Sequence, residues 1–207
     1  MLASPQEKCY IDCEWGRFSM RVIALQGSPR RDGHTALLLE SFLSPFCTAH
    51  AVKRVDVCYQ HILPCWSCYA CQNSGLCVRD DDMRQLYTHL AEDDVVVIAS
   101  PIYFYGVTAQ LKAVVDRCQP FWTHPNRRKT SRVGVLLLTA GAPDGPGTGV
   151  STTAAQVRIF LTCTGAPLKH VFAATNTDAV PAREQHGLLT EVAAAARQLA
   201  GAAKGGN

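Results

Sequence analysis

The segment Gly27-Ser-Pro-Arg-Arg-Asp-Gly-His-Thr35 decides how this chain is expected to fold. It follows an apolar run, Arg21–Gln26, with the length and composition of a short buried strand. It precedes residues 35–43, whose apolar positions recur at helical spacing. A turn between a strand and a helix leaves backbone N–H groups unpaired at the helix N-terminus, where they and the helix dipole favour an anion such as a phosphate. The alternative interpretation is an ordinary surface turn.

Two common phosphate-binding motifs do not match this segment. A mononucleotide P-loop needs Gly-x4-Gly-Lys-Ser/Thr, but Gly27 and Gly33 enclose five residues and His34 stands in the lysine position. A dinucleotide fingerprint needs Gly-x-Gly-x-x-Gly, which Ser28-Pro29 excludes. What remains is a hydroxyl-lined loop after the first strand, as flavodoxin-like folds use for the phosphate of FMN.

Length and composition describe one packed domain. The chain has 207 residues, of which 47% are hydrophobic and 18% charged, and this suits a single α/β domain. The net charge of +3 gives no reason to expect nucleic-acid binding. No apolar run is long enough for a membrane span, and the first twenty residues lack the apolar centre of a signal peptide. We therefore expect a cytoplasmic protein, with residues 1–19 as a loosely ordered extension and residues 20–207 as the domain.

Apolar strand patterns alternate with helical patterns along the rest of the chain. Further strands are predicted at 51–57, 94–99, 132–138 and 168–174, and further helices at about 83–90, 108–119, 152–161 and 188–199, with Asp80–Asp82 capping the first of these. Five strands alternating with five helices predict an α/β fold with a doubly wound parallel sheet. Ligands bind such sheets at the carboxyl ends of the strands. The loops that begin at Gly27, Ser100 and Thr139 should meet there.

The loop Ser100-Pro-Ile-Tyr-Phe-Tyr-Gly106 carries three aromatic residues at this expected edge. Aromatic rings beside a phosphate site suit a flat heteroaromatic ligand. The rings could instead belong to the core, but three successive positions cannot all face inward.

The segments GSPRRDGHT, SPIYFYGVTAQLKAVVDR and LLLTAG together resemble the NADPH-dependent FMN reductase branch of the flavodoxin-like superfamily, from about Met20 to the last strand. The resemblance implies strand order 2-1-3-4-5, noncovalently bound FMN, and a homodimer or homotetramer. It implies that the FMN phosphate is held by Ser28, Arg30, Gly33, His34 and Thr35. The isoalloxazine ring would lie against Pro101, Ile102, Tyr103, Phe104, Tyr105 and Gly106, and against Thr139, Ala140 and Gly141.

Four of the ten cysteines cluster in a loop spanning residues 61–79. The pattern Pro64-Cys65-x2-Cys68-x2-Cys71-x5-Cys77, followed by Asp81-Asp82-Met83, resembles the iron–sulfur flavoproteins. Overlapping C-x-x-C pairs let a short loop wrap its thiolates around one small centre, so Cys65, Cys68, Cys71 and Cys77 could hold one [4Fe-4S] cluster. Three alternatives remain open, namely a zinc site, regulatory disulfides, and a loop without metal.

A flavin carries its own redox chemistry, so no side-chain acid, base or nucleophile is required. The two resemblances together imply an oxidoreductase that oxidises NAD(P)H through FMN, with the cluster as a one-electron carrier. Two alternatives are a non-enzymatic electron carrier supplied by ferredoxin and an FMN-binding redox sensor.

Overall fold

The computed structural model describes residues 20–47, 49–143, 145 and 149–202, so the predicted N-terminal extension lies outside the described residues. Five parallel strands form one sheet in the order β2-β1-β3-β4-β5, which confirms the predicted fold class. The strands are β1 (Arg21–Gln26), β2 (Ala51–Asp56), β3 (Val95–Pro101), β4 (Val133–Thr139) and β5 (Leu168–Ala174).

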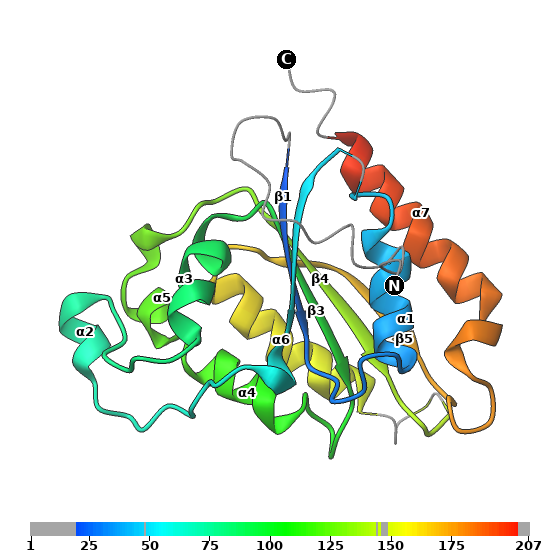
Figure 1. The fold of residues 1–207 in the computed structure, drawn as a ribbon, viewed down its shortest axis with the longest axis horizontal. Coiled ribbons are helices and arrows are strands. Elements are labelled where there is room, and N and C mark those ends of the chain that lie inside the picture. Colours follow the sequence, from blue (N-terminus) through cyan, green and yellow to red (C-terminus); the bar gives the residue numbers. More distant parts are fainter. Residues whose placement is uncertain (1–19, 48, 144, 146–148, 203–207) are drawn as a thin grey trace, which may run out of the picture.

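Helices cover both faces of this sheet (Figure 1). They are α1 (His34–Leu43), α2 (Ala70–Ser74), α3 (Met83–Glu92), α4 (Ala109–Asp116), α5 (Gln119–Thr123), α6 (Val150–Cys163) and α7 (His186–Ala202). Short 3-10 turns occupy Val57–Tyr59, Pro125–Arg127 and Ala182–Glu184. Helices α1 and α7 lie on one face, and α3, α4 and α6 lie on the other. None of the helices in the described ranges is both long and apolar enough to cross a bilayer.

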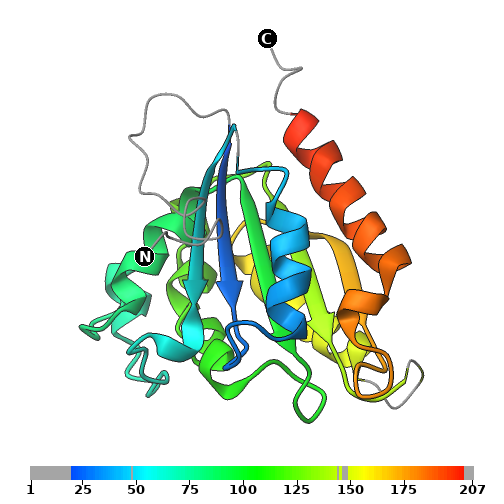
Figure 2. The ribbon, with the colours of Figure 1, turned by 45° about the vertical axis from the view of Figure 1, so that its right-hand side comes forward.

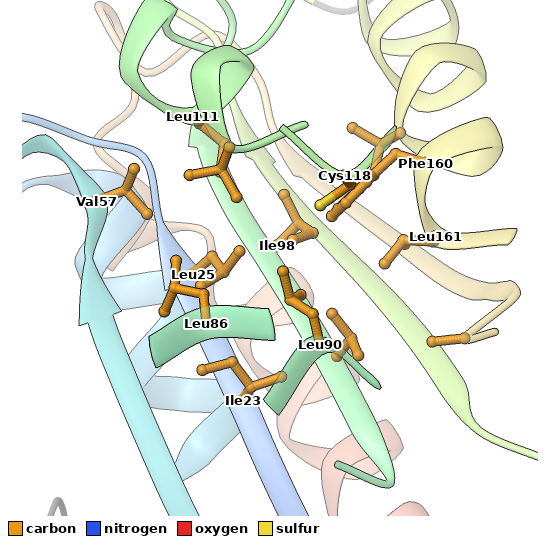
Figure 3. Packing of buried hydrophobic residues seen from close by; sticks show 14 of the residues in the cluster. Ile23, Leu25, Val57, Leu86, Leu90, Ile98, Leu111, Cys118, Phe160 and Leu161 are labelled. Atoms are coloured by element: carbon orange, nitrogen blue, oxygen red, sulfur yellow. The ribbon is translucent and has the colours of Figure 1, made fainter. Parts of the chain in front are cut away.

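The sheet separates two apolar clusters because successive side chains of a strand point to opposite faces. On β1, Val22 and Ala24 pack with α1 and α7, whereas Ile23 and Leu25 pack with α3 and α4. Figure 3 shows the second cluster, in which side chains from β1 and β3 meet those of α3, α4 and α6. Burial on both faces explains why the central strands read as continuous apolar runs.

The prediction of one helix over 108–119 is wrong at its C-terminal end. Helix α4 ends at Asp116, and a separate helix, α5, begins at Gln119 with Pro120 in its first turn. Proline lacks an N–H group and its ring clashes with the preceding helical turn, but it is tolerated at the start of a new helix. The chain therefore forms two helices here in place of one.

Arg132, predicted as the first residue of a strand, lies just before β4 and is buried. Its guanidinium donates hydrogen bonds to the carbonyl oxygens of His89, Leu90 and Asp93 at the end of α3, and of Thr164 after α6. Burial lowers the pKa of Arg132 and outweighs the opposing effect of the Asp93 carboxylate, so that the pKa is about 10. Arg132 thus joins the ends of α3 and α6 at the edge where the strands begin.

Candidate functional site

Three loops meet at the opposite edge, where β1, β3 and β4 end. Figure 2 shows the strand arrowheads directed to this lower edge, with the loops after β1 and β3 beside each other. The backbone N–H of Gly27 donates to Ala99 O at 2.7 Å, and the Thr108 hydroxyl donates to Gly27 O at 2.7 Å. Thr35 and Thr139 are joined through their hydroxyl groups. The predicted convergence of the loops is therefore present.

The loop after β1 leads into α1 without a side-chain cap. Gly33 is the N-cap residue, and no hydrogen bond from a described side chain caps the helix. The first N–H groups of a helix have no partner within it, so they are available to a ligand. A Cβ atom on Gly27 would lie 2.8 Å from the Leu111 side chain, so this position requires glycine. The buried Oε1 of Gln26, at the end of β1, has no partner among the described residues.

The predicted phosphate-binding side chains take different positions in this loop. Ser28 is buried, and its Oγ accepts the N–H of Arg30 at 3.1 Å, which leaves the Ser28 O–H as a donor. The Arg30 side chain is exposed. The Nδ1 of His34 accepts the N–H of Ala182 at 3.4 Å. His34 is therefore tied to the turn before α7, and only its other ring nitrogen remains for a ligand.

The aromatic residues after β3 form the tip of a tight hairpin. Tyr103 and Gly106 exchange two backbone hydrogen bonds of 2.9 and 3.1 Å. Phe104 and Tyr105 between them have φ values of +48° and +62°. Phe104 is fully exposed, and both tyrosines are about half exposed, so the rings do not belong to the core. Positive φ at a non-glycine residue costs energy and is concentrated at functional sites.

The loop after β4 closes the third side of the site. Thr139 and Ala140 are buried, and Thr139 O accepts the N–H of Ile102 at 2.8 Å, next to the half-buried Pro101. A Cβ on Gly141 would collide with the carboxylate of Asp178, a residue that the sequence analysis did not single out. Asp178 reaches this loop because it follows β5, which pairs with β4.

The four clustered cysteines all line one cavity of about 430 Å³ between the cysteine loop and the ends of α4 and α5. Trp66 and Tyr69 also line it but are 63% and 64% exposed, and Arg79 lies over the Trp66 ring at 4.2 Å. The remaining wall comes from α4, α5 and their junction and includes Asp116, Arg117, Gln119, Pro120 and Thr123. The structure thus places all four cysteines on one cavity, and their role as ligands of one centre stays a prediction.

The backbone of the cysteine loop folds back on itself through three left-handed residues. Ser67, Tyr69 and Gly75 have φ values of +58°, +61° and +66°. Gly75 ends α2, and its carbonyl oxygen accepts a hydrogen bond of 2.6 Å from Arg127 Nη1. A Cβ at Gly75 would crowd the Arg127 and His124 side chains, so the glycine bend predicted before Cys77 is present.

A buried ion pair holds both ends of the cysteine loop. Arg117 Nη1 donates to Asp81 Oδ2 at 2.7 Å and to Leu63 O at 2.8 Å, and Nη2 donates to Asp81 Oδ1 at 3.1 Å. The Arg117 and Asp81 side chains are each 1% exposed. The Asp81 carboxylate also accepts the N–H groups of Leu63 and Met83. Arg117 was not singled out in the sequence, because only folding brings the end of α4 to this loop.

The aspartates predicted to cap α3 therefore act mainly elsewhere. Asp82, the N-cap residue, makes no side-chain capping bond, and its Oδ2 accepts the N–H of His61 at 2.6 Å. Asp81 accepts the Met83 N–H at 3.2 Å, so the predicted cap is only partly present. Both carboxylates accept backbone N–H groups at the start of the cysteine loop.

The electrostatic environment differs among the four thiols. A hydrogen bond from the Ala70 backbone, followed by one from Trp66, lowers the pKa of Cys68. Burial raises the pKa of Cys71, and negative charge on Cys77, Cys65 and Cys68 adds to the effect. No three potential ligands in the described part of the chain converge tightly enough for a single metal ion. A [4Fe-4S] cluster bonds each cysteine to a different iron, so four thiols spread around one cavity fit its donor set.

Comparison with known proteins gives the family. The sequence profile of the NADPH-dependent FMN reductases matches residues 20–178, and the chain belongs to this family. Among its curated relatives, an iron–sulfur flavoprotein of Methanocaldococcus jannaschii is 31% identical over 143 residues, which cover 69% of this chain and 72% of the relative. An iron–sulfur flavoprotein of Archaeoglobus fulgidus is 35% identical over 123 residues, 59% of this chain and 56% of that protein. The match thus spans little more than half of the Archaeoglobus protein.

Solved structures share the fold. The NAD(P)H:quinone oxidoreductase from Methanothermobacter marburgensis superposes with a TM-score of 0.67 at 18% identity, over 87% of this chain and 96% of the other. An FMN-dependent NADH-azoreductase from Bacillus anthracis, solved in complex with FMN, gives a TM-score of 0.59 at 11% identity, over 87% and 98%. At these identities the likeness concerns the flavodoxin-like fold alone.

Proposed function

We propose that this protein is an FMN-dependent NAD(P)H oxidoreductase that passes electrons from a reduced nicotinamide to an acceptor, with a [4Fe-4S] cluster as a second redox centre. The observation that carries the proposal is the convergence of three loops on the sheet edge at which α1 begins uncapped. FMN, when bound, accepts a hydride and can release its two electrons singly. Family membership supports the same proposal.

The loop after β1 supplies the phosphate-binding groups. The free N–H groups of the first turn of α1 and the helix dipole favour the phosphate dianion. The Ser28 hydroxyl adds a donor, the Thr35 hydroxyl adds another when Thr139 donates the hydrogen bond between them, and exposed Arg30 adds a positive charge. Gly27 and Gly33 keep this loop free of side chains, since a Cβ on Gly33 would also lie 3.1 Å from Arg30 Cβ. These residues fit a single terminal phosphate.

The other two loops would hold the ring system. The hairpin 103–106 presents aromatic rings that can stack on a flat ligand and exclude water. Thr139, Ala140 and Gly141 would border the ring, with the backbone N–H of Ala140 bonded to Ala174 O and its carbonyl oxygen bonded to Thr177, so this part of the wall is held rigid. The tip residue Phe104 makes no core contact, so its exposed ring is available to the ligand or to a second copy of the chain.

The cysteine cavity fits the cluster. Cys65, Cys68, Cys71 and Cys77 are the ligands that we propose, because they alone among the wall residues are thiols. The fold orders this loop through the Arg117–Asp81 ion pair and through α2. The cavity lies on the surface, where an electron can pass to another protein or to a neighbouring subunit.

Anaerobic purification followed by absorbance spectroscopy, flavin identification and metal analysis tests the proposal. We expect FMN, four irons and four sulfides per chain, and steady-state oxidation of NADH or NADPH. Cys68→Ser should lose the iron but retain FMN, whereas Cys163→Ser, outside the cavity, should retain both. One zinc per chain, or iron that survives Cys68→Ser, would contradict the cluster and leave the FMN assignment standing. Released FAD would contradict the FMN assignment.

A second candidate is an electron carrier that ferredoxin reduces through the cluster. The exposed Trp66 and Tyr69 beside the cysteine cavity favour it, because exposed aromatic residues are common at protein-docking surfaces. In that case the flavin would become reduced by ferredoxin but not by NADH or NADPH under steady-state conditions.

A further inference from the structure

The guanidinium of Arg117 has one buried donor that the fold leaves unused. Both terminal nitrogens are paired with Asp81, and one of them also with Leu63 O. Nε is buried and has no partner among the described residues. A buried donor without a partner costs free energy, so such an atom is usually matched by a group that binds there.

The unpaired donor belongs to a wall of the cysteine cavity. Arg117 lines this cavity together with all four clustered cysteines. Burial lowers the pKa of Arg117, but hydrogen bonds with Asp81 and then Cys77 outweigh this and leave the pKa above its ordinary value. Cys77 lines the same cavity as Arg117 and is the clustered cysteine whose charge affects the pKa of the guanidinium.

Few other charges face this wall. Asp116 lies in it, but its carboxylate pairs with Lys112 at 2.5 Å. Arg79 contributes a second cation and also donates to Pro64 O at 3.1 Å. Arg117 differs from Arg79 in being 1% exposed, so its charge is poorly screened by water.

We propose that Arg117 is a positioning residue for the cluster, whose Nε–H donates a hydrogen bond to the Cys77 thiolate and whose charge raises the reduction potential of the [4Fe-4S] centre. The inference rests on the cluster in the proposed function. Reduction adds one electron and no proton, so the cavity gains one negative charge while no bond forms or breaks. A fixed cation and a hydrogen bond to a ligand sulfur both stabilise that extra charge.

The Asp81 carboxylate should shift the reduction potential in the direction opposite to Arg117. It partly neutralises Arg117 and lies equally deep in the protein. Replacing Asp81 with asparagine keeps the shape and removes this negative charge, so the reduced cluster should become easier to form. Replacing Arg117 with lysine keeps a positive charge that can reach Asp81 but removes the Nε donor and the fixed guanidinium geometry. The two variants should therefore shift the potential in opposite directions.

The test is a dithionite titration of the full chain, reconstituted anaerobically and followed by electron paramagnetic resonance. Iron, sulfide and FMN are counted in each sample. We expect Arg117→Lys to keep four irons and FMN with a more negative midpoint, and Asp81→Asn to have a less negative midpoint. Arg84→Lys, an exposed arginine paired with Asp80, is the matched control and should leave the midpoint unchanged.

If Arg117 only holds the cysteine loop in place, the midpoint potentials of the two variants will follow a different pattern. Shifts of both variants in the same direction, or a wild-type midpoint in Arg117→Lys, would overturn the tuning role. Loss of iron with retention of FMN in Arg117→Lys would also overturn it, because Arg117 would then serve assembly. If Arg117→Lys does not fold, the sign of the Asp81→Asn shift decides. Wild-type protein that binds FMN but no iron would refute this inference and the cluster, but not the proposed FMN oxidoreductase.

Discussion

The Oγ1 atoms of Thr35 and Thr139 lie 2.8 Å apart in a buried hydrogen bond that joins residues 104 positions apart in the chain. One residue belongs to the first turn of α1, and the other ends β4. The bond therefore fixes the loop that we expect to hold the FMN phosphate relative to a loop that we expect to hold the ring.

Thr139→Val removes one partner of this bond with little change in shape. We expect the free energy of unfolding to fall by about 1–3 kcal/mol, because the Thr35 hydroxyl is left buried and unpaired. Urea denaturation measures this change. Thr162→Val, which removes an exposed helical hydroxyl, should change stability by less than about 0.5 kcal/mol. Equal losses in the two variants would contradict the importance of the cross-loop bond.

Ser28→Ala should weaken FMN binding. The buried hydroxyl is one of the donors in the loop after β1, and a hydrogen bond to a charged group contributes about 1.5–3 kcal/mol. Fluorescence titration of the apoprotein with FMN measures the dissociation constant. Ser41→Ala, whose hydroxyl bonds within α1, is the matched control and should bind FMN as the wild type does. An unchanged affinity in Ser28→Ala would exclude this serine from the phosphate site.

Phe104→Asn tests whether the strained hairpin serves the ligand. Asparagine tolerates positive φ better than phenylalanine, and the fully exposed ring belongs to neither apolar cluster of the described residues. Stability should be unchanged or rise by up to about 1 kcal/mol, whereas FMN affinity should fall. Trp122→Asn removes another exposed aromatic side chain and should not affect FMN. Lower stability together with normal FMN binding would refute the prediction.

We also predict a homodimer or homotetramer. The exposed rings of the 103–105 hairpin and of Trp122 offer apolar surface that association would bury. Light scattering across micromolar concentrations gives the mass of the particle. A constant monomer mass would rule the prediction out, and a mass reduced by Phe104→Asn would place the hairpin at the interface.

Asp94 should make stability depend on acid pH. Burial raises the pKa of Asp94, but hydrogen bonds with the Lys129 side chain and the Arg21 N–H outweigh it, so the pKa lies below its ordinary value of 3.8. A carboxylate with a depressed folded-state pKa contributes stability above its unfolded pKa and loses it as the pH falls through the folded pKa. Asp94→Asn should thus be less stable than the wild type at pH 7.

The stability difference between Asp94→Asn and the wild type should shrink as the pH falls below about 4. Urea denaturation between pH 3 and pH 7 follows it. Asp80→Asn, which removes an exposed carboxylate paired with Arg84, should show a small difference throughout. A constant difference for Asp94→Asn across the range would contradict the assignment.

Much of the fold could be predicted because its signals are local. Each central strand is buried on both faces, so the run Val95–Ala99 is apolar throughout and its prediction as a strand is confirmed. The order of the strands is confirmed as well. The break after Asp116 was missed because the apolar spacing continues across it. Pro120 marks the start of a second helix there.

The supporting side chains of the candidate site could not be predicted. Arg117 meets Asp81 across 36 positions of the chain, and Asp178 meets Gly141 only through the pairing of β4 with β5. Such contacts depend on tertiary structure and leave no periodic signal. His34 shows that a residue singled out in the sequence can also be engaged elsewhere. Its position suggests a phosphate ligand, but one ring nitrogen already accepts a backbone N–H.

The four carbonyl oxygens that Arg132 binds have a consequence for motion. They join the ends of α3 and α6 at the edge of the sheet where the strands start. Breaking this junction would leave several buried carbonyl groups and a guanidinium without partners, so opening there is costly. In the described residues of the far edge, the loops are joined by single buried bonds such as Thr35–Thr139 and Thr108–Gly27, whereas Arg132 binds four carbonyl groups at once. Cofactor entry and exit should therefore occur by local opening at the far edge. The edge held by Arg132 should stay closed during that opening.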